Sequence, residues 1–451
     1  MSSHQTFAPS LNTSKRETPR PLRIVHLATT DVGGGAAIAS YRLHQGLVRL
    51  GVDSEMIVAQ KLTDDSRVHG PKTLMEKLMP RLAHHIDQMP RRFLQTANQS
   101  LLSPAWIGSN ALKRARALKP DVINLHWISN GFLRPEALSA FTTAQQTPLV
   151  WTLHDMWAFC GAEHYTEGDT RYVSGYTAQN RPQGERGFDL NRWAWKRKMR
   201  VFPRLQQFRV VSDSRWLGEC AAQSQLFREH RVLPINYGLD TDIFKPIPKD
   251  VARQILNLPR DKKIVLFGAI NASGDKRKGI DLLANALHSY FLNTELRGNL
   301  DVECVVFGAS QPPKSDAISP LEFGFPMRFC GSLTDNIALA VLYSAADVMI
   351  VPSREEAFGQ TALEALSCGT PVVAFRVGGL PDMIQHQHNG YLAEPFDVHD
   401  MARGIHSILS NDAAWQTLSH NARQSVLGGF TLEHQARRYL EVYEELLAVR
   451  T

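Results

Sequence analysis

The chain has 451 residues, with 43% hydrophobic and 21% charged residues and a formal net charge of +6. This length allows two or three domains with a core in each, and the composition is that of an ordinary globular protein. Five scattered cysteines without a CxxC pair argue against a disulfide framework and fit a reducing compartment. No apolar run approaches the roughly eighteen residues of a membrane span. The mild positive charge suits anionic partners without choosing among nucleotide phosphates, lipid head groups and nucleic acid.

The N-terminal segment 1–21 is expected to be a disordered tail. Its first twenty residues are rich in Ser, Thr and Pro, and no apolar stretch of a signal peptide follows them. We therefore expect a cytoplasmic protein, with contact to the inner face of the plasma membrane left open.

In chain order, the first half begins with a β-strand, glycine loop, helix, β-strand unit. Gly33-Gly34-Gly35 forms the loop, and a helical pattern follows over 36–50 until Gly51. A long, basic and partly apolar helical stretch is predicted over 74–118. The strands predicted in this half are 22–28, 53–59, 122–126, 149–153 and 208–212.

The alternation restarts in the second half. Strands are predicted at 263–268, 302–308, 327–330, 347–352 and 371–376. Helices are predicted at 279–290, 337–345, 361–368 and 432–449. The pattern predicts an α/β protein with two doubly wound, Rossmann-like domains facing a central cleft, in which ligands bind at the carboxyl ends of the strands.

A proline cluster within 238–259 marks the expected domain boundary. We assign 22–245 to the first domain and 246–430 to the second. Residues 431–451 form a C-terminal helix that can cross back to the first domain.

The most informative segment is 351–373, with the sequence VPSREEAFGQTALEALSCGTPVV. A strand ends at Pro352, and a loop leads into a helix that stops at Gly369. The start of that helix offers free backbone N–H groups, a ready site for phosphate. The residues that supply them are Phe358, Gly359, Gln360 and Thr361.

Two carboxylates flank this turn, Glu356 before it and Glu364 on the helix. Carboxylates accept hydrogen bonds from vicinal sugar hydroxyls, so the pattern suits a sugar nucleotide with its pyrophosphate between them. The alternative is that Glu364 only pairs on a helix surface.

The two glutamates with seven intervening residues resemble the signature of retaining GT-B glycosyltransferases of family 4. The resemblance extends over about 22–450 and is stronger in the second half. It implies that Glu356 contacts the transferred sugar, that Glu364 contacts the ribose, and that the turn between them binds the diphosphate. It also implies a GT-B fold and retention of anomeric configuration.

Residues 276–280, KRKGI, resemble the phosphate site of that family, with Lys278 at the usual lysine position. A cation there can neutralise the departing diphosphate. The chain departs from many relatives because Ala269, not arginine, follows Gly268. Arg277 is the candidate replacement, and a solvated run of charges is the alternative.

In the first half, Gly34 and Gly35 let the backbone approach a phosphate or sugar. The resemblance places this loop beside the donor phosphates and the acceptor, and a tight turn without a ligand is the alternative. The loop is not a dinucleotide fingerprint, because Ile38 stands where the third glycine belongs.

His154 follows a predicted strand and should point into the cleft. The resemblance implies a catalytic histidine here, which would hydrogen-bond the sugar and stabilise developing charge, with Asp155 fixing local geometry. A structural histidine is the alternative. For His126, we favour a structural or acceptor-side role.

No metal and no cofactor are predicted. Asp240 and Asp242 form a DxD pattern, but their segment resembles a structural hinge of the family. Residues 154–165 resemble bacterial exopolysaccharide transferases of the colanic-acid type, many of which carry several further cysteines. Here Cys160 is alone, whereas a zinc site needs about four ligands.

Basic and aromatic residues over 81–119 could face an anionic membrane and a lipid-linked acceptor. They are Arg81, Arg91, Arg92, Lys113, Arg114, Arg116 and Lys119, with Phe93 and Trp106. A second basic cluster lies within 192–200. Solvated helix faces are the alternative.

The sequence thus predicts a retaining glycosyltransferase that moves a hexose from a UDP- or GDP-linked donor. The expected acceptor is a growing, lipid-linked exopolysaccharide or lipopolysaccharide. Alternatives are a nucleotide-sugar epimerase of GT-B shape and a non-catalytic sugar-nucleotide-binding partner. A nucleic-acid partner is not predicted, because the basic residues lack a recognition motif.

Overall fold

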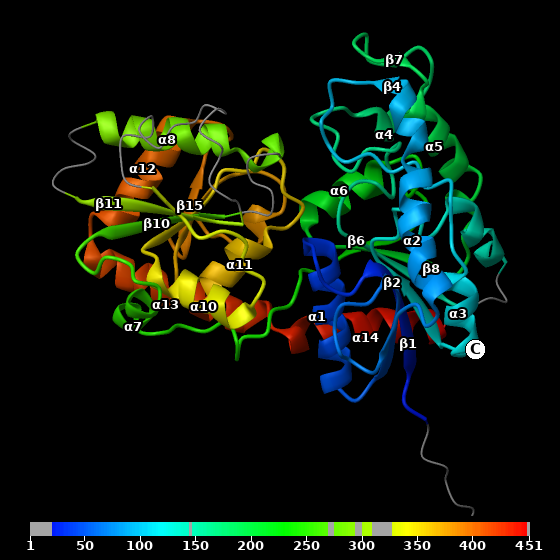
Figure 1. Cartoon of the computed structure of the whole chain (residues 1–451), viewed down its shortest axis with the longest axis horizontal. Helices are drawn as coiled ribbons and strands as arrows, with labels where there is room; N and C mark the ends of the chain where they lie inside the picture. The colour runs from blue at the N-terminus through cyan, green and yellow to red at the C-terminus, as the bar shows by residue number, and fades with distance from the viewer. Residues whose placement is uncertain (1–19, 144–146, 269–274, 294–299, 309–326, 449–451) are drawn as a thin grey trace, which may run out of the picture.

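The computed structural model describes residues 20–143, 147–268, 275–293, 300–308 and 327–448. The chain forms two α/β domains side by side, each built on a parallel sheet (Figure 1). The predicted pair of doubly wound domains is therefore confirmed. Residues 1–19 of the predicted tail lie outside the described residues.

The first domain contains a seven-stranded parallel sheet in the order β3-β2-β1-β5-β6-β8-β9. Its strands are β1 (Arg23–Thr30), β2 (Asp53–Gln60), β3 (Val68–His69), β5 (Val122–Leu125), β6 (Leu149–Leu153), β8 (Phe208–Ser212) and β9 (Val232–Pro234). Its helices are α1 (Gly35–Arg49), α2 (Leu74–Asp87), α3 (Ala111–Ala117), α4 (Arg171–Ser174), α5 (Leu190–Met199) and α6 (Arg215–Gln223). A separate antiparallel pair joins β4 (Leu94–Gln95) to β7 (Arg186–Gly187).

The second domain contains a six-stranded parallel sheet in the order β12-β11-β10-β13-β14-β15. Its strands are β10 (Lys263–Gly268), β11 (Val302–Phe307), β12 (Met327–Phe329), β13 (Val348–Val351), β14 (Val372–Phe375) and β15 (Gly390–Ala393). The helices from here to the C-terminus are α7 (Lys249–Ile255), α8 (Ile280–Leu292), α10 (Asn336–Ala345), α11 (Gln360–Ser367), α12 (Val398–Leu409), α13 (Asp412–Gly429) and α14 (Leu432–Ala448).

The central strand β10 is apolar from Ile264 to Phe267 because both of its faces are buried. In β10, Ile264 and Leu266 contribute to one hydrophobic cluster, whereas Val265 and Phe267 contribute to the cluster on the other face. A strand covered by helices on both sides loses the alternation of polar and apolar residues and becomes continuously apolar.

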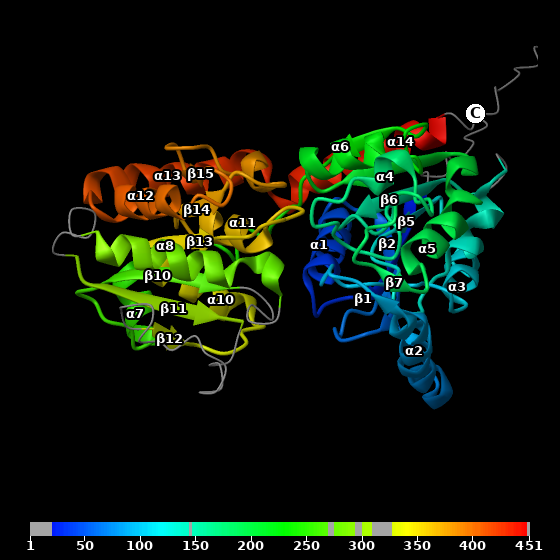
Figure 2. The same cartoon turned by 90° about the horizontal axis from the view of Figure 1, so that it is seen from above.

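Helix α14 leaves the second domain and packs against the first (Figures 1 and 2). Tyr439 and Tyr443 are fully buried in a cluster with residues of β1 and α1. Their hydroxyls also reach the sheet, because Tyr439 contacts Thr152 Oγ1 at 2.9 Å and Tyr443 accepts from Asn124 Nδ2 at 2.8 Å. The last helix therefore belongs to the core of the first domain.

The prediction of one helical stretch over 74–118 is wrong. Helix α2 ends at Asp87, a 3-10 turn follows at Met89–Phe93, and α3 begins only at Ala111. Pro90 and Pro104 interrupt the helical pattern. The Asp87 carboxylate fixes the intervening loop by accepting the backbone N–H of Trp106 at 2.9 Å.

The short strands β3, β9 and β15 were not predicted. They lie at edges of the two sheets and are only two to four residues long. Across the described ranges, none of the helices has the length and apolar character to cross a bilayer.

Candidate active site

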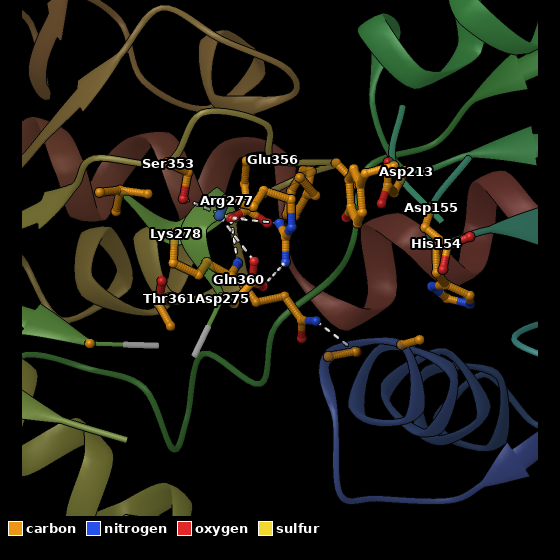
Figure 3. Close-up of a pocket in the computed structure, with 18 of the residues that line it drawn as sticks. His154, Asp155, Asp213, Asp275, Arg277, Lys278, Ser353, Glu356, Gln360 and Thr361 are labelled. Carbon is orange, nitrogen blue, oxygen red and sulfur yellow. Dashed lines mark hydrogen bonds and ion pairs between the residues drawn. The ribbon is translucent and has the colours of Figure 1, made fainter. Parts of the chain in front are cut away.

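A cavity of about 350 Å³ lies between the two domains, at the carboxyl ends of their strands (Figure 3). This volume is within the usual range for small-molecule sites. Most of the predicted site residues line it, and they come from both domains. They are Gly34, Gly35, His154, Arg277, Lys278, Glu356, Phe358, Gly359, Gln360 and Thr361.

The central feature of the cavity is an ion pair between Lys278 and Glu356. Lys278 Nζ donates to Glu356 Oε2 at 2.7 Å, and Ser353 Oγ donates to the same oxygen at 3.1 Å. Burial opposes ionisation of Glu356, but the charges of Lys278 and Arg277 outweigh it and hold its pKa below the usual value. Glu356 is therefore an anion at neutral pH.

The backbone before α8 places Lys278 opposite Glu356. The Asp275 side chain caps the 3-10 turn Lys276–Lys278, and Gly279 closes that turn with φ +70°. A Cβ at Gly279 would lie 1.9 Å from the carbonyl oxygen of Pro352, so only glycine fits this close approach.

Arg277 provides a second cation at the cavity and contacts the first domain. Its guanidinium lies 4.2 Å from the ring centroid of Tyr165 and donates to Asp275 at 2.9 Å. Nη1 is 3.9 Å from Glu356 Oε2. Ala269, the position at which many relatives carry arginine, lies outside the described residues.

The start of α11 lines the cavity between these cations and the first domain. Gly359 is the N-cap with φ +104°, and a Cβ there would lie 2.7 Å from Leu380 Cδ2. The first N–H groups of a helix have no partner within it and favour anions. Gln360 crosses the cleft, because its Nε2 donates to the Gly35 carbonyl at 2.7 Å.

Glu364 does not line the cavity. It is buried, and it accepts from Arg42 Nη2 at 2.7 Å and from the Tyr343 hydroxyl at 2.9 Å. Arg42 belongs to α1, so this ion pair connects the two domains. The predicted contact of Glu364 with a ribose stays a prediction. The alternative, in which Glu364 only pairs on a helix surface, does not fit, because Glu364 and its partner Arg42 are both buried.

His154 lies at the end of a chain of three histidines. His26 Nδ1 is 2.9 Å from His126 Nε2, and His126 Nδ1 is 3.0 Å from His154 Nε2. His154 Nδ1 is 2.5 Å from the Tyr237 hydroxyl. Burial lowers the pKa of all three imidazoles, that of His154 to about 4. His154 is therefore neutral, and protein groups occupy both of its nitrogens.

The sequence reasoning missed Asp213, Tyr237 and Arg42. Asp213 follows β8 directly, so the rule that selected His154 after β6 would also have selected it. Tyr237 and Arg42 carry no such signal, because their partners are distant in sequence.

The DxD pattern and Cys160 make contacts with other parts of the protein. In the parts of the chain that are described, no three His, Cys, Asp or Glu side chains are grouped to hold an ion. Asp240 accepts from Arg49. The Lys198 ammonium donates to the carbonyl oxygens of Cys160 at 3.2 Å and Gly161 at 2.7 Å.

Both domains match known protein families. Residues 33–242 match the model described as Glycosyltransferase Family 4, and residues 261–411 match the model described as Glycosyl transferases group 1.

Among curated proteins, the chain is similar to D-inositol 3-phosphate glycosyltransferases. It is 34% identical over 225 residues to that of Thermobispora bispora, covering 48% of this chain and 51% of the relative. It is 35% identical over 249 residues to that of Geodermatophilus obscurus, covering 52% and 53%. The chain therefore spans about half the length of the curated relatives it matches.

Solved structures show the same fold over nearly the whole chain. Sucrose-phosphate synthase from Thermosynechococcus elongatus has a TM-score of 0.64 at 22% identity, covering 95% of this chain and 100% of that one. Anabaena HepE in complex with UDP and glucose has a TM-score of 0.61 at 18% identity, covering 94% and 99%.

Proposed function

Because its two domains place the chain among the GT-B glycosyltransferases of family 4 and group 1, we propose that it transfers a hexose from a nucleoside-diphosphate sugar to an acceptor hydroxyl. The observation that carries this proposal is the half-buried Lys278–Glu356 pair beside the start of α11. It combines a cation and free N–H groups for a diphosphate with a carboxylate for a sugar. Anabaena HepE, which has a similar fold, forms a complex with UDP and glucose, and this favours a UDP-linked donor.

In the proposed reaction, the diphosphate binds Lys278, Arg277 and the first N–H groups of α11. These preorganised charges stabilise the diphosphate as the bond from the anomeric carbon to its phosphate oxygen breaks. The acceptor oxygen bonds the same carbon, and its proton passes to the departing phosphate oxygen on the same face. Such a reaction retains anomeric configuration.

The carboxyl groups at the cavity support this route over a covalent sugar–enzyme intermediate. Glu356 is held by Lys278, and burial raises the pKa of Asp213 to about 8, so that Asp213 is protonated at neutral pH. Of the other carboxyl groups that line the cavity in the described ranges, Asp155 is paired with His164 at 2.6 Å and Asp275 with Arg277 at 2.9 Å. None of these four is a free carboxylate nucleophile.

A neutral glycan is the acceptor that the geometry favours. A second cavity of about 340 Å³ adjoins the first through Gly34 and Gly35. Trp127, Asn130 and small residues of the first domain line it, and no charged residue of the described ranges does. Such a lining suits sugar hydroxyls and ring stacking better than a phosphorylated inositol.

Peripheral contact with an anionic membrane fits the region around α2, which projects from the first domain (Figure 2). Leu78, Leu82 and Phe93 there are 64%, 54% and 67% exposed. Arg91 and Arg92 lie in the same turn as Phe93. Exposed apolar side chains beside cations favour an anionic lipid surface, which would present a lipid-linked exopolysaccharide or lipopolysaccharide precursor.

A screen of UDP- and GDP-sugars by thermal shift and slow donor hydrolysis tests the proposal. We expect one donor to stabilise the protein and to be hydrolysed, with or without EDTA, and Glu356→Gln to abolish hydrolysis. Glu229→Gln, at a carboxyl that is 77% exposed, is the matched control and should behave as wild type. Release of an epimerised sugar nucleotide would identify an epimerase instead, and absence of binding to every donor would contradict the proposal.

A further inference from the structure

Asp213 is a buried carboxyl group at the cavity with no role in the reaction described so far. It follows β8, is 1% exposed, and lines the cavity beside Tyr237 and His154. Figure 3 shows it on the side of the first domain, with Glu356 between it and Lys278.

One oxygen of this carboxyl group is unused. Ser214 Oγ donates to Asp213 Oδ1 at 3.1 Å, and the Tyr237 hydroxyl reaches the same carboxyl. Oδ2 has no hydrogen bond of normal geometry within the described residues. Buried polar atoms are nearly always paired, so an unpaired oxygen beside a ligand cavity indicates a partner that the ligand supplies.

The histidine chain fixes the direction in which hydrogen bonds run toward Asp213. Each neutral imidazole has one donor nitrogen and one acceptor nitrogen. His26 Nε2 is buried without a partner among the described residues, which suits a bare acceptor nitrogen better than an N–H. His26 Nδ1 then donates to His126, His126 Nδ1 donates to His154, and His154 Nδ1 donates to the Tyr237 oxygen.

With its oxygen accepting from His154, the Tyr237 hydroxyl directs its own proton toward Asp213. The ring of Tyr237 is also held in place, since it packs edge-on against Phe358 with centroids 4.9 Å apart. Ser214 and Tyr237 therefore hold the Asp213 carboxyl group, and its Oδ2 has no partner among the described residues.

We propose that Asp213 contacts the transferred sugar, that its Oδ2 hydrogen-bonds one hexose hydroxyl, and that Tyr237 and the three histidines are positioning residues for it. This inference rests on the proposed function. It assigns to the first domain a group that discriminates between donor sugars.

The surroundings of Asp213 select a hydroxyl over a phosphate. Burial, reinforced by the charges of Glu356 and Asp155, raises the pKa of Asp213 to about 8 despite hydrogen bonds from Tyr237 and Ser214. A protonated carboxyl both donates and accepts, as a sugar hydroxyl requires. The cations that suit the diphosphate, Lys278 and Arg277, belong to the second domain.

Calorimetric titration of the full chain with UDP, GDP, UDP-glucose and GDP-mannose tests the inference. In Asp213→Ala, we expect the Kd of the nucleoside diphosphate to stay within about twofold, whereas the matching sugar nucleotide binds about tenfold more weakly. Asp213→Asn, which keeps a neutral group that donates and accepts, should recover most of that loss. Tyr237→Phe keeps the ring but removes the hydroxyl, and it should show a smaller loss confined to the sugar nucleotide.

The outcomes distinguish failure of the role of Asp213 from failure of the proposed function. If Asp213→Ala changes neither affinity, or weakens UDP and UDP-glucose equally, the role of Asp213 is overturned and the proposed function stands. If the wild-type protein binds none of the four nucleotides, the proposed function itself fails. If thermal unfolding shows that Asp213→Ala does not fold, Asp213→Ser takes its place under the same criteria.

Discussion

The two sides of the cavity are built in the same way, but they carry side chains of different charge. On both sides, functional groups follow the carboxyl ends of parallel strands. The second domain contributes charges, namely Lys278, Arg277 and the anionic Glu356. The first domain contributes two groups that are neutral at pH 7, His154 with its lowered pKa and Asp213 with its raised pKa, and its ionised Asp155 is paired with His164 at 2.6 Å. In the proposed reaction, the second domain would therefore bind the charged diphosphate of the donor, and the first domain would bind its sugar hydroxyls.

The largest effect should come from removing a charge on the second-domain side. Lys278→Met deletes the cation that would stabilise the departing diphosphate, and it leaves Glu356 without its main ionic partner. We expect kcat for donor hydrolysis to fall by about 10²–10³.

Lys276→Met is the matched control, because Lys276 is exposed in the same run of basic residues. It should retain nearly full activity. An equal loss in both variants would mean that the basic run acts only through its overall charge.

The next largest effect concerns the connection between the two sides. Arg42→Met leaves the buried Glu364 carboxylate without its partner across the cleft, and both side chains of this pair are under 10% exposed. Breaking such a pair from one side should lower the free energy of unfolding by about 3 kcal/mol, measured by chemical denaturation.

Arg228→Met, at a side chain that is 60% exposed, is the control and should change stability little. Adding Glu364→Gln to Arg42→Met should recover part of the loss, because the unpaired charge is then gone. Equal stability of Arg42→Met and the wild type would show that the pair does not hold the domains together.

Much of the fold could be read from the sequence because its signals are local. The frame around Glu356 and the alternation of strands and helices depend on residues close together in the chain. Pro90 and Pro104 are also a local signal, and they argue against one helix over 74–118. The prediction followed the basic and apolar pattern of this stretch instead.

The missed contacts are those made by residues far apart. Arg42 and Glu364 are separated by 322 positions, and Thr152 meets Tyr439 across 287. The histidine chain joins residues at three neighbouring strands, β1, β5 and β6, and β1 adjoins β5 in the sheet although β2, β3 and β4 lie between them along the chain. Only the folded sheet brings these groups together, so no local pattern predicts them.

A smaller effect should follow from crowding the turn that presents Lys278. Gly279→Ala places a Cβ against the Pro352 carbonyl at a residue with φ +70°. We expect a stability loss of about 1–3 kcal/mol in thermal or chemical unfolding, with weaker donor binding because the turn must shift. Gly429→Ala, in a helix with nothing within 4 Å of the added atom, is the control and should unfold like the wild type. A Gly279→Ala protein with unchanged stability and donor affinity would show that this turn is not a rigid support.

The smallest effect should be a pH dependence that separates the two sides of the cavity. The pKa of Asp213 is raised from 3.8 to about 8 in the folded protein, so its neutral form stabilises the fold fully below pH 4. That contribution is lost as the pH rises toward 8, because the unfolded chain releases this proton near pH 4 whereas the folded protein keeps it until about pH 8.

The groups that face Asp213 do not change charge in this window. Tyr237 keeps its proton, and the lowered pKa values of Glu356 and Asp155 leave both ionised. The free energy of unfolding of the wild type should therefore fall between pH 6 and pH 8 more than that of Asp213→Asn, as measured by denaturant titrations at both pH values. Parallel curves for the two proteins would show that Asp213 is already ionised in the fold, and His154, not Asp213, would then supply a neutral group on the first-domain side.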